Sequence, residues 1–471
     1  MPTFSRFFRV RVLVSAILTV LVAVPVLMHG AGNTFQGLTS TAGGFSTWDA
    51  DLIDVEDVPE TGSGVYVAVV DTGLVPNWRD YFPVARVATQ LGTGFQQNIS
   101  FPKAFGNPCA FEVEVGALRQ STWVGSTGST HGTHVASTIL GYEYSSNFDA
   151  LAGFPLPPIV VRGIAPDVTV IPVKVLSDYQ IPSLPNCSTP IAAQTVVFGT
   201  SEAVAAGIDY VTNLAIAGYR PMVINMSLGG PALEAVEKTA IDRAIANGVV
   251  VVAAAGNEGE DGMGYPGAYP PVISAGSAGW TGEWLKPGSA TLGSNRYRMW
   301  WLKYPFAPLL ANSGEVADPT SANDVYVSDF SSRALVGLGQ QLDVLAPGSW
   351  VRGPFPGDPG FAHLPWWSHG IGDLKGNNPG NFFYVGGTSM ATPHVASVAA
   401  RMVQKNPSLT NAQVEFLLRG TAMPIPASGS KTILDNTVVT TVTWDGLCGV
   451  NPCDAVGAGL VNASAAVAAV P

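Results

Sequence analysis

The chain has 471 residues, of which 47% are hydrophobic and only 12% are charged. It can therefore bury a large core, and it does not have the composition of a disordered protein. The formal net charge is −11, and a negative field argues against nucleic acid as a partner. The length fits one large domain or two ordinary ones.

The N-terminal segment is basic and then apolar. Three arginines precede an apolar run at residues 12–28, and small residues follow it. This order is typical of a secretory signal peptide, so residues 1–31 are predicted to direct export and the protein to be secreted. The run is long for a signal and Pro25 interrupts it. An uncleaved membrane anchor, with the rest of the chain outside the cytoplasm, is the alternative.

From residue 65 onward, short apolar runs alternate with helical stretches. Strands are predicted at 65–70, 168–176, 222–227 and 249–255, and helices at 201–212, 233–247 and 389–404. Fully apolar strands that alternate with helices indicate a parallel sheet covered on both faces. The predicted fold is therefore α/β, with a mostly parallel sheet between two layers of helices.

Two long stretches, near 280–327 and 350–383, interrupt this alternation and are predicted to be insertions. They are rich in Gly, Pro, Asn and aromatic residues, and loops of this length are unusual in a compact domain. Their tryptophans are candidates for an extended substrate groove or a partner surface. Packing over the core is the alternative.

The four cysteines can pair if the chain is exported. Cys448 and Cys453 are close enough in sequence to close a small loop. Cys109 and Cys187 would then form the second bridge by elimination. Free buried thiols are the alternative, and the spacing does not resemble a zinc site.

Polar residues far apart in sequence fall at the boundaries of the predicted elements. Asp71 and Asn257 follow apolar strands, whereas His131 and Ser389 each open a helix. Sites in parallel sheets gather at the carboxyl ends of the strands. Because core packing would not place polar residues there, this pattern predicts a catalytic constellation.

A serine hydroxyl needs a base to take its proton and a third group to orient that base. Of the six histidines, His131 opens a helix and can reach outward, whereas His134, one turn later, is expected to pack. His394 follows Ser389 by five residues and is expected to face away from it. His131 is therefore the predicted base.

Three motifs carry a family resemblance. In chain order they are Asp71-Thr72-Gly73, His131-Gly132-Thr133-His134 and Gly387-Thr388-Ser389-Met390-Ala391-Thr392-Pro393. Together they resemble the subtilisin-like serine proteases, the subtilases. Segments 163–166, 173–176, 223–230, 253–259, 330–332 and 342–348 resemble the family as well. The resemblance covers residues 48–471 outside the two insertions, and it implies a subtilisin-like three-layer fold for this peptidase domain.

The resemblance also implies roles for the boundary residues. Asp71 would orient His131, and His131 would deprotonate Ser389 during acyl-enzyme formation. Asn257 would donate its side-chain amide to the oxyanion beside the Ser389 backbone N–H. The implied protein is an endopeptidase that acts on protein or peptide substrates, and it is expected to be a monomer.

The resemblance further assigns substrate-binding residues. The two walls of the primary pocket would be Ser227-Leu228-Gly229 and Ala255-Gly256. Gly264 would lie at the pocket floor, where the absent side chain leaves room for a large apolar residue. Glu258 at the rim either attracts a basic substrate residue or is simply a solvated charge.

No cofactor is expected for the chemistry, but the resemblance implies a structural calcium ion. The loop at 141–163 occupies the place where many relatives bind one, and Asn147 and Asp149 are the candidate oxygen donors, besides Glu143 and the backbone. Residues 32–47 are predicted to be a linker or a short prosegment, whereas relatives often carry a longer folded one.

Two other functions remain open. A catalytically silent binding protein could share the fold, although the intact set of Asp71, His131, Ser389 and Asn257 argues against it. A processing enzyme held at the membrane by its leader is the second alternative.

Overall fold

The computed structural model describes residues 38–144, 159–185, 187, 190, 192–283, 322–356, 382–435 and 438–471. The predicted leader, the calcium candidates Asn147 and Asp149, and the interiors of both predicted insertions lie outside the described residues.

A nine-stranded sheet organises the described residues, in the order β14-β13-β12-β11-β1-β8-β2-β5, with β16 beside β13. The strands that run parallel are β1 (Tyr66–Asp71), β2 (Thr93–Ser100), β8 (Thr169–Lys174), β11 (Met222–Met226), β12 (Val250–Ala254), β13 (Ile273–Trp280) and β16 (Val344–Pro347). The antiparallel edge strands are β14 (Val325–Val327) and β5 (Glu114–Ser121). The prediction of a mostly parallel sheet is confirmed.

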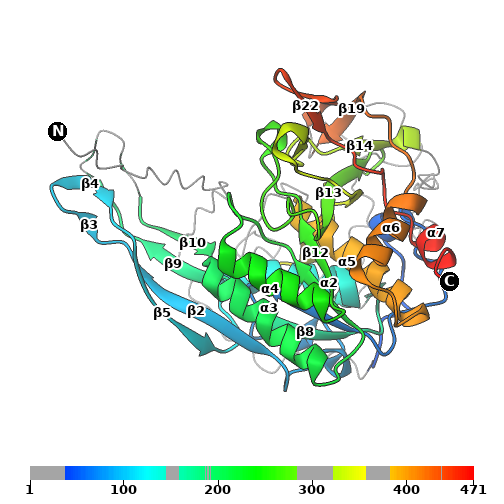
Figure 1. Ribbon diagram of the computed structural model, residues 1–471, viewed down its shortest axis with the longest axis horizontal. Coiled ribbons are helices and arrows are strands. Elements are labelled where there is room, and N and C mark those ends of the chain that lie inside the picture. Colours follow the sequence, from blue (N-terminus) through cyan, green and yellow to red (C-terminus); the bar gives the residue numbers. More distant parts are fainter. Residues whose placement is uncertain are drawn as a thin grey trace, which may run out of the picture.

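Alternate residues of β1 point to two separate hydrophobic clusters. Val67 and Val69 join the cluster that includes residues of helices α2 (Thr130–Leu140) and α5 (Thr388–Lys405). Ala68 and Val70 join the cluster that includes residues of α3 (Ser201–Ile216) and α4 (Ala235–Ala246). Figure 1 shows α3 and α4 side by side over one face of the sheet. The three-layer architecture follows from this alternation and confirms the predicted fold class.

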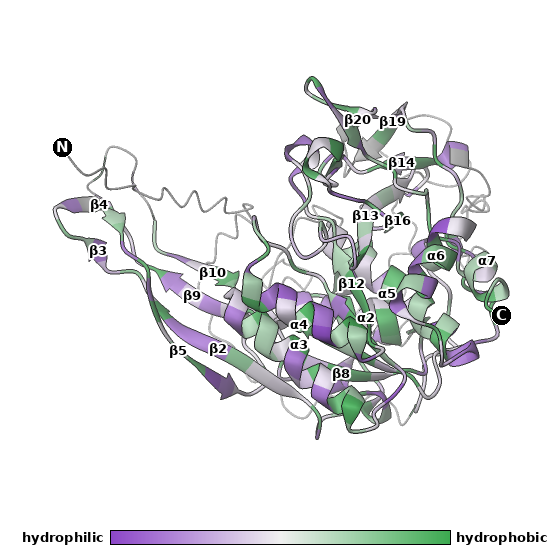
Figure 2. Cartoon of the chain, viewed as in Figure 1, coloured by the Kyte–Doolittle hydropathy of each residue, from purple (hydrophilic) through white to green (hydrophobic). Residues whose placement is uncertain are grey.

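Strands β2 and β5 form one edge of the sheet and extend away from the helical layers as an arm (Figure 1). Two small hairpins accompany them: β3 (Lys103–Ala104) with β4 (Asn107–Phe111), and β9 (Ser177–Ile181) with β10 (Gln194–Phe198). Figure 2 shows hydrophilic residues along β2 and β9. Because these strands lack a continuous apolar run, the sequence did not predict them.

Both predicted disulfides are present. Cys109 in β4 bonds Cys187, which ties the two hairpins of the arm together. Cys448 bonds Cys453 and closes a loop near the C-terminus. The free-thiol alternative is wrong for all four cysteines.

The ends of the predicted insertions belong to the core. Trp280 closes β13, and Val325–Val327 return as β14. In the second stretch, β17 (Val351–Pro354) pairs antiparallel with β18 (Phe382–Val385), and Phe382 is buried. The regular fold therefore reaches further into both stretches than their sequence boundaries suggested.

Four smaller elements complete the part of the fold that matters here. Strands β6 (Gly141–Tyr144) and β7 (Ile159–Arg162) pair antiparallel. Helices α6 (Asn411–Thr421) and α7 (Ala463–Ala468) pack against α5. Of the helices in the described ranges, none has both the length and the apolar character that crossing a membrane requires.

Candidate active site

Asp71 and His131 meet at the carboxyl end of β1, an interior strand of the sheet. Asp71 is the last residue of β1, and His131 is the second residue of α2. The His131 Nδ1 atom lies 2.8 Å from Asp71 Oδ1. The Asp71 side chain is fully buried, whereas 23% of the His131 side chain is exposed. If Nδ1 donates to the carboxylate, Nε2 is left as the acceptor.

The residues that directly follow Asp71 and His131 hold these two in place. The Thr72 backbone N–H donates to Asp71 Oδ1 (2.6 Å), and the Gly132 N–H donates to Thr72 Oγ1 (2.9 Å). A Cβ on Gly132 would lie 2.4 Å from the Gly73 carbonyl oxygen and 3.1 Å from Asp71 Oδ1. Only glycine permits this approach of α2 to the end of β1, which explains the residue that follows His131.

Two opposing effects set the pKa of His131. Burial alone would lower it, because it disfavours the imidazolium. The charge of Asp71 and its hydrogen bond favour the imidazolium, and together they raise the pKa above its ordinary value of 6.5. The Asp71–His131 pair is therefore electrostatically prepared to accept a proton.

The other two described histidines are packed inside the protein. Burial, and then the charge of His131, lowers the pKa of His134 to about 3, and its Nε2 lies 3.0 Å from the Val351 carbonyl. His394 is fully buried, with Nε2 3.0 Å from Asp49 Oδ2 and Nδ1 2.8 Å from the Met390 carbonyl. Neither imidazole has a hydrogen bond to Ser389.

Ser389 lies in the first turn of α5, which packs against α2. Its hydroxyl donates to the Ser227 carbonyl (3.1 Å), and its own carbonyl accepts from Ser227 Oγ (2.7 Å). In the described part of the chain, the Ser389 hydroxyl is thus hydrogen-bonded to the residue that follows β11, and not to His131. The backbone N–H of Ser389 belongs to the first helical turn, where amides lack intrahelical acceptors.

The Asn257 amide is oriented by Thr388, the residue before Ser389. Its Oδ1 accepts from the Thr388 backbone N–H (2.9 Å) and from Thr388 Oγ1 (3.0 Å). A backbone N–H can only donate, so the amide group is fixed with Nδ2 on the other side. A Cβ on Gly387 would lie 3.8 Å from Nδ2. The two N–H groups of the Asn257 side chain therefore lie beside the start of α5.

Glu258 is exposed, as expected for a solvated charge, and its carboxylate also makes hydrogen bonds that the sequence did not predict. Its Oε2 accepts from the Asn257 backbone N–H (2.7 Å) and from Ser332 Oγ (3.0 Å). Ser332 is fully buried, and its hydroxyl also accepts from the Glu258 N–H (3.0 Å). The exposed carboxylate is thus bonded to the loop that carries Asn257. The sequence matched Ser332 to a family segment but gave it no role.

Three chain segments enclose the predicted substrate-binding residues. Gly264 N–H donates to the Ala255 carbonyl (2.8 Å), and Gly230 exchanges two backbone hydrogen bonds with Tyr265 (2.7 and 2.8 Å). A Cβ on Gly264 would lie no nearer than 3.5 Å to the described atoms around it, and one on Gly229 no nearer than 3.6 Å. Gly229 and Gly264 therefore face each other, and a methyl group at either position would be in ordinary van der Waals contact with the opposite segment.

The remaining predicted pocket residues lie in the same place. Ser227 and Leu228 follow β11, and Ala255 and Gly256 follow β12. Gly256 has a φ of +110°, which an L side chain rarely adopts, and a Cβ there would lie 2.5 Å from Glu258 Oε2. All six predicted pocket residues and all four predicted catalytic residues lie at the same end of the sheet.

A metal site is not formed by the residues that the structure describes: they contain no group of three or more His, Cys, Asp or Glu side chains that could hold an ion. Asn147 and Asp149 lie outside these residues.

Comparison with known proteins identifies the family. The model of the subtilase family matches residues 62–450, so the chain belongs to the subtilase family of serine endopeptidases. This confirms the resemblance of the three motifs.

Individual relatives are bacterial. The chain is 29% identical to a subtilisin from Bacillus pumilus over 78% of this chain and 87% of that protein. It is also 29% identical to Subtilisin NAT from Bacillus subtilis subsp. natto, over 77% of this chain but only 61% of that protein. Among solved structures, Sphericase is 24% identical with a TM-score of 0.49, over 88% of this chain and 97% of that one.

Proposed function

We propose that this protein is an exported serine endopeptidase that hydrolyses peptide bonds through an acyl-enzyme on Ser389. The contact of 2.8 Å between His131 Nδ1 and the buried Asp71 carboxylate carries the proposal. It fixes the tautomer that leaves Nε2 available as a base, beside a helix whose first turn presents a serine.

In the reaction, the Ser389 hydroxyl turns from the Ser227 carbonyl and transfers its proton to His131 Nε2. The Ser389 oxygen attacks the substrate carbonyl carbon and forms a tetrahedral adduct. His131 then gives the proton to the leaving amine, and the acyl-enzyme remains. Water then attacks the acyl carbon while His131 takes a proton from it. The ester bond to Ser389 breaks, and His131 returns the proton to the Ser389 oxygen.

Asn257 Nδ2 and the Ser389 backbone N–H are the donors to the oxyanion. Both are directed to the start of α5, where the helix dipole favours negative charge. Because Thr388 holds Asn257 Oδ1 with two hydrogen bonds, the amide does not need to reorganise when charge develops. This preorganisation is the source of transition-state stabilisation.

Substrates are proteins or peptides. The substrate residue before the scissile bond is apolar and binds between the Gly229 and Gly264 segments.

The leader at 1–31 directs export, and the exported enzyme is a monomer. N-terminal sequencing of the mature protein distinguishes a cleaved signal peptide from an uncleaved anchor. A calcium ion bound near Asn147 and Asp149 would support stability and takes no part in the chemistry.

A fluorophosphonate probe tests the proposal. Wild-type protein should be labelled at Ser389, and Ser389→Ala should not be labelled. Ser397→Ala is the matched control, because Ser397 lies in the same helix and is fully buried. Absence of labelling in the folded wild type would reject the proposed function.

A further inference from the structure

The loop that carries Asn257 is held from outside by the segment Phe330–Arg333. The two segments are linked by five hydrogen bonds. Three join backbone groups: Ser332 N–H to Gly256 O (3.0 Å), Gly259 N–H to Phe330 O (2.9 Å) and Arg333 N–H to Gly259 O (2.9 Å). Two involve the Ser332 hydroxyl, which accepts from the Glu258 N–H (3.0 Å) and donates to Glu258 Oε2 (3.0 Å). The position of Asn257 therefore depends on where residues 330–333 lie.

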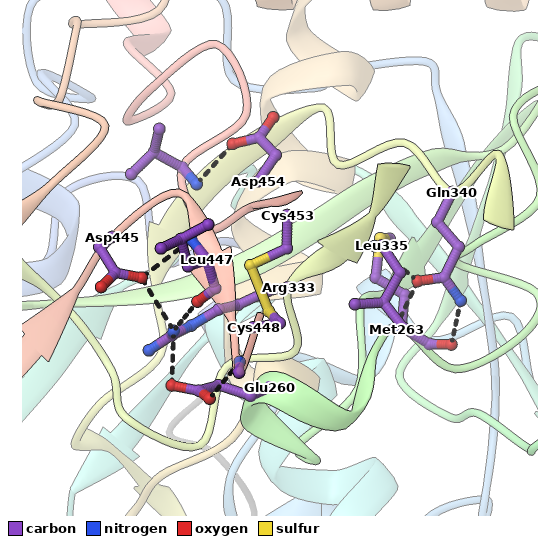
Figure 3. Close-up of a disulfide and its surroundings, with 12 residues drawn as sticks. Glu260, Met263, Arg333, Leu335, Gln340, Asp445, Leu447, Cys448, Cys453 and Asp454 are labelled. Atoms are coloured by element: carbon purple, nitrogen blue, oxygen red, sulfur yellow. Dashed lines mark hydrogen bonds and ion pairs between the residues drawn. A yellow bond between two sulfur atoms is a disulfide. The ribbon is translucent and has the colours of Figure 1, made fainter. Parts of the chain in front are cut away.

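The guanidinium of Arg333 extends this support beyond the two segments. Its side chain is only 7% exposed, and Nη1 donates to Glu260 Oε1 at 2.9 Å. Nη1 and Nη2 also reach the carbonyls of Leu447 (3.4 Å) and Thr443 (3.3 Å). Figure 3 shows Arg333 between Glu260 and the chain around Leu447. Glu260 lies in the short helix η4 (Gly259–Asp261), three residues after Asn257.

The loop closed by the Cys448–Cys453 disulfide holds the same carboxylate from the other side. Gly449 N–H donates to Glu260 Oε2 (3.2 Å), so each oxygen of Glu260 has its own donor. Strand β22 (Asn451–Asp454) pairs with β21 (Leu447–Cys448), and also with β15 (Ala334–Leu335), where Cys453 lies opposite Leu335. The disulfide loop is thus joined to the chain directly after Arg333.

A buried guanidinium is expensive unless its partners are well placed, and its partners here come from two distant parts of the chain. We propose that Arg333 is a positioning residue for Asn257. It fixes η4 through Glu260 and thereby places the loop that carries Asn257, whose amide Thr388 orients toward the oxyanion. This inference rests on the proposed role of Asn257 in the reaction.

Gln340 offers a matched comparison within the same support. Its Oε1 accepts from the Met263 N–H (3.0 Å) and the Leu335 N–H (3.0 Å), and its Nε2 donates to the Met263 carbonyl (3.1 Å). Met263 precedes Gly264. Gln340 therefore supports the substrate pocket, whereas Arg333 supports the oxyanion donor, and their loss should affect different kinetic constants.

The test is a double-mutant cycle with a peptide amide substrate. Arg333→Met should lower kcat about tenfold with KM changed by less than about twofold, because the donor is misplaced only for the transition state. Arg333→Lys, which keeps the charge beside Glu260, should recover part of the loss. In an Asn257→Ala background, Arg333→Met should change kcat by less than about twofold. Gln340→Met should instead mainly raise KM.

Two results would overturn the inference. Arg333→Met could lower the melting temperature without changing kcat, which would make Arg333 only an anchor for the C-terminal hairpin. Its kcat loss could persist in the Asn257→Ala background, which would mean that it acts elsewhere. If Arg333→Met does not fold, Glu260→Gln takes its place with the same readouts, since Glu260 is 53% exposed.

Wild type and the Asn257→Ala variant distinguish a failure of this inference from a failure of the proposed function. If wild type is not labelled by fluorophosphonate, or if Asn257→Ala alone leaves kcat unchanged, the proposed function or its oxyanion donor is wrong, and the role of Arg333 falls with it. If both behave as expected and only the cycle fails, the role of Arg333 alone is wrong.

Discussion

The nucleophile side and the oxyanion side of the site are supported in different ways. Asp71 and His131 lie on regular elements, a central strand and a helix packed directly on it. Asn257 lies in a loop beyond β12. Thr388 holds its side chain, but the loop itself is supported by residues 330–333 and by a disulfide loop near the C-terminus. The sheet thus fixes the proton-transfer pair, whereas segments distant in sequence fix the loop that carries the oxyanion donor.

The largest effect is expected on the nucleophile side. Ser389→Ala should lower kcat by roughly 10⁶-fold, and adding His131→Ala should lower it little further, because the two residues act as one unit. Steady-state hydrolysis of a peptide amide measures this. Additive losses would show that Ser389 and His131 do not share a step.

A smaller loss is expected on the oxyanion side. Asn257→Ala should reduce kcat by about 10²–10³-fold with little change in KM, because its amide binds charge that develops only in the transition state. Asn257→Asp keeps the shape but places a carboxylate beside Thr388. It should be no better than Asn257→Ala, and retention of full kcat by either variant would contradict the role of the amide.

Substrate preference should respond to the pocket floor. A Cβ at Gly264 meets no atom closer than 3.5 Å, so Gly264→Ala should fold normally. The added methyl group should take up room in the proposed pocket between the Gly229 and Gly264 segments. It should therefore disfavour large aromatic residues before the scissile bond by about 10–200-fold in kcat/KM. Hydrolysis of paired substrates with Ala or Phe at that position measures the ratio, and an unchanged ratio would place the pocket elsewhere.

The pH dependence of kcat/KM should report the Asp71–His131 pair. His131 must be neutral to accept a proton, so activity should rise as the pH increases through its pKa. Because Asp71 raises that pKa, the midpoint of the acidic limb should lie above 6.5. In Asp71→Asn the charge is gone, and the residual activity should have its midpoint at a lower pH. A midpoint below 6.5 in wild type would contradict the assignment.

A change outside both regions should affect stability alone. Burial, with a contribution from Glu234, raises the pKa of Glu237 in α4 to about 7. The folded state therefore binds this proton more tightly than the unfolded chain does. The Glu237 carboxyl therefore contributes fully to the free energy of unfolding below pH 4.5, and this contribution is lost as the pH rises through about 7. Glu237→Gln should raise the melting temperature at pH 8 but not at pH 4, with kcat unchanged. Equal melting temperatures at pH 8 would contradict the raised pKa.

Much of the nucleophile side could be predicted from the sequence. Asp71 follows a continuous apolar strand and His131 opens a helix, so local patterns marked them before their contact was known. Strand β1 was predicted at 65–70 and observed at Tyr66–Asp71, and the helix predicted at 389–404 is Thr388–Lys405. Element type and order are determined locally in these cases, because buried parallel strands are apolar throughout.

The supports of the oxyanion side could not be predicted in the same way. Ser332, Arg333 and Gln340 act through hydrogen bonds to backbone groups more than 70 residues away in sequence. Such bonds produce no periodicity, and the family resemblance of segment 330–332 did not show which groups Ser332 would contact. Glu258 was expected to interact with substrate or solvent. Its hydrogen bond from Ser332 Oγ, 74 residues away, exists only because residues 256–259 and 330–333 are side by side in the fold.

The burst phase of a stopped-flow reaction tests the central claim most directly. With an activated ester substrate, wild type should release about one equivalent of leaving group per enzyme before steady state, because acylation of Ser389 precedes hydrolysis. Asn257→Ala should give a slower burst of the same amplitude, and Ser389→Ala should give none. A burst of full amplitude in Ser389→Ala would contradict the claim that Ser389 carries the acyl group.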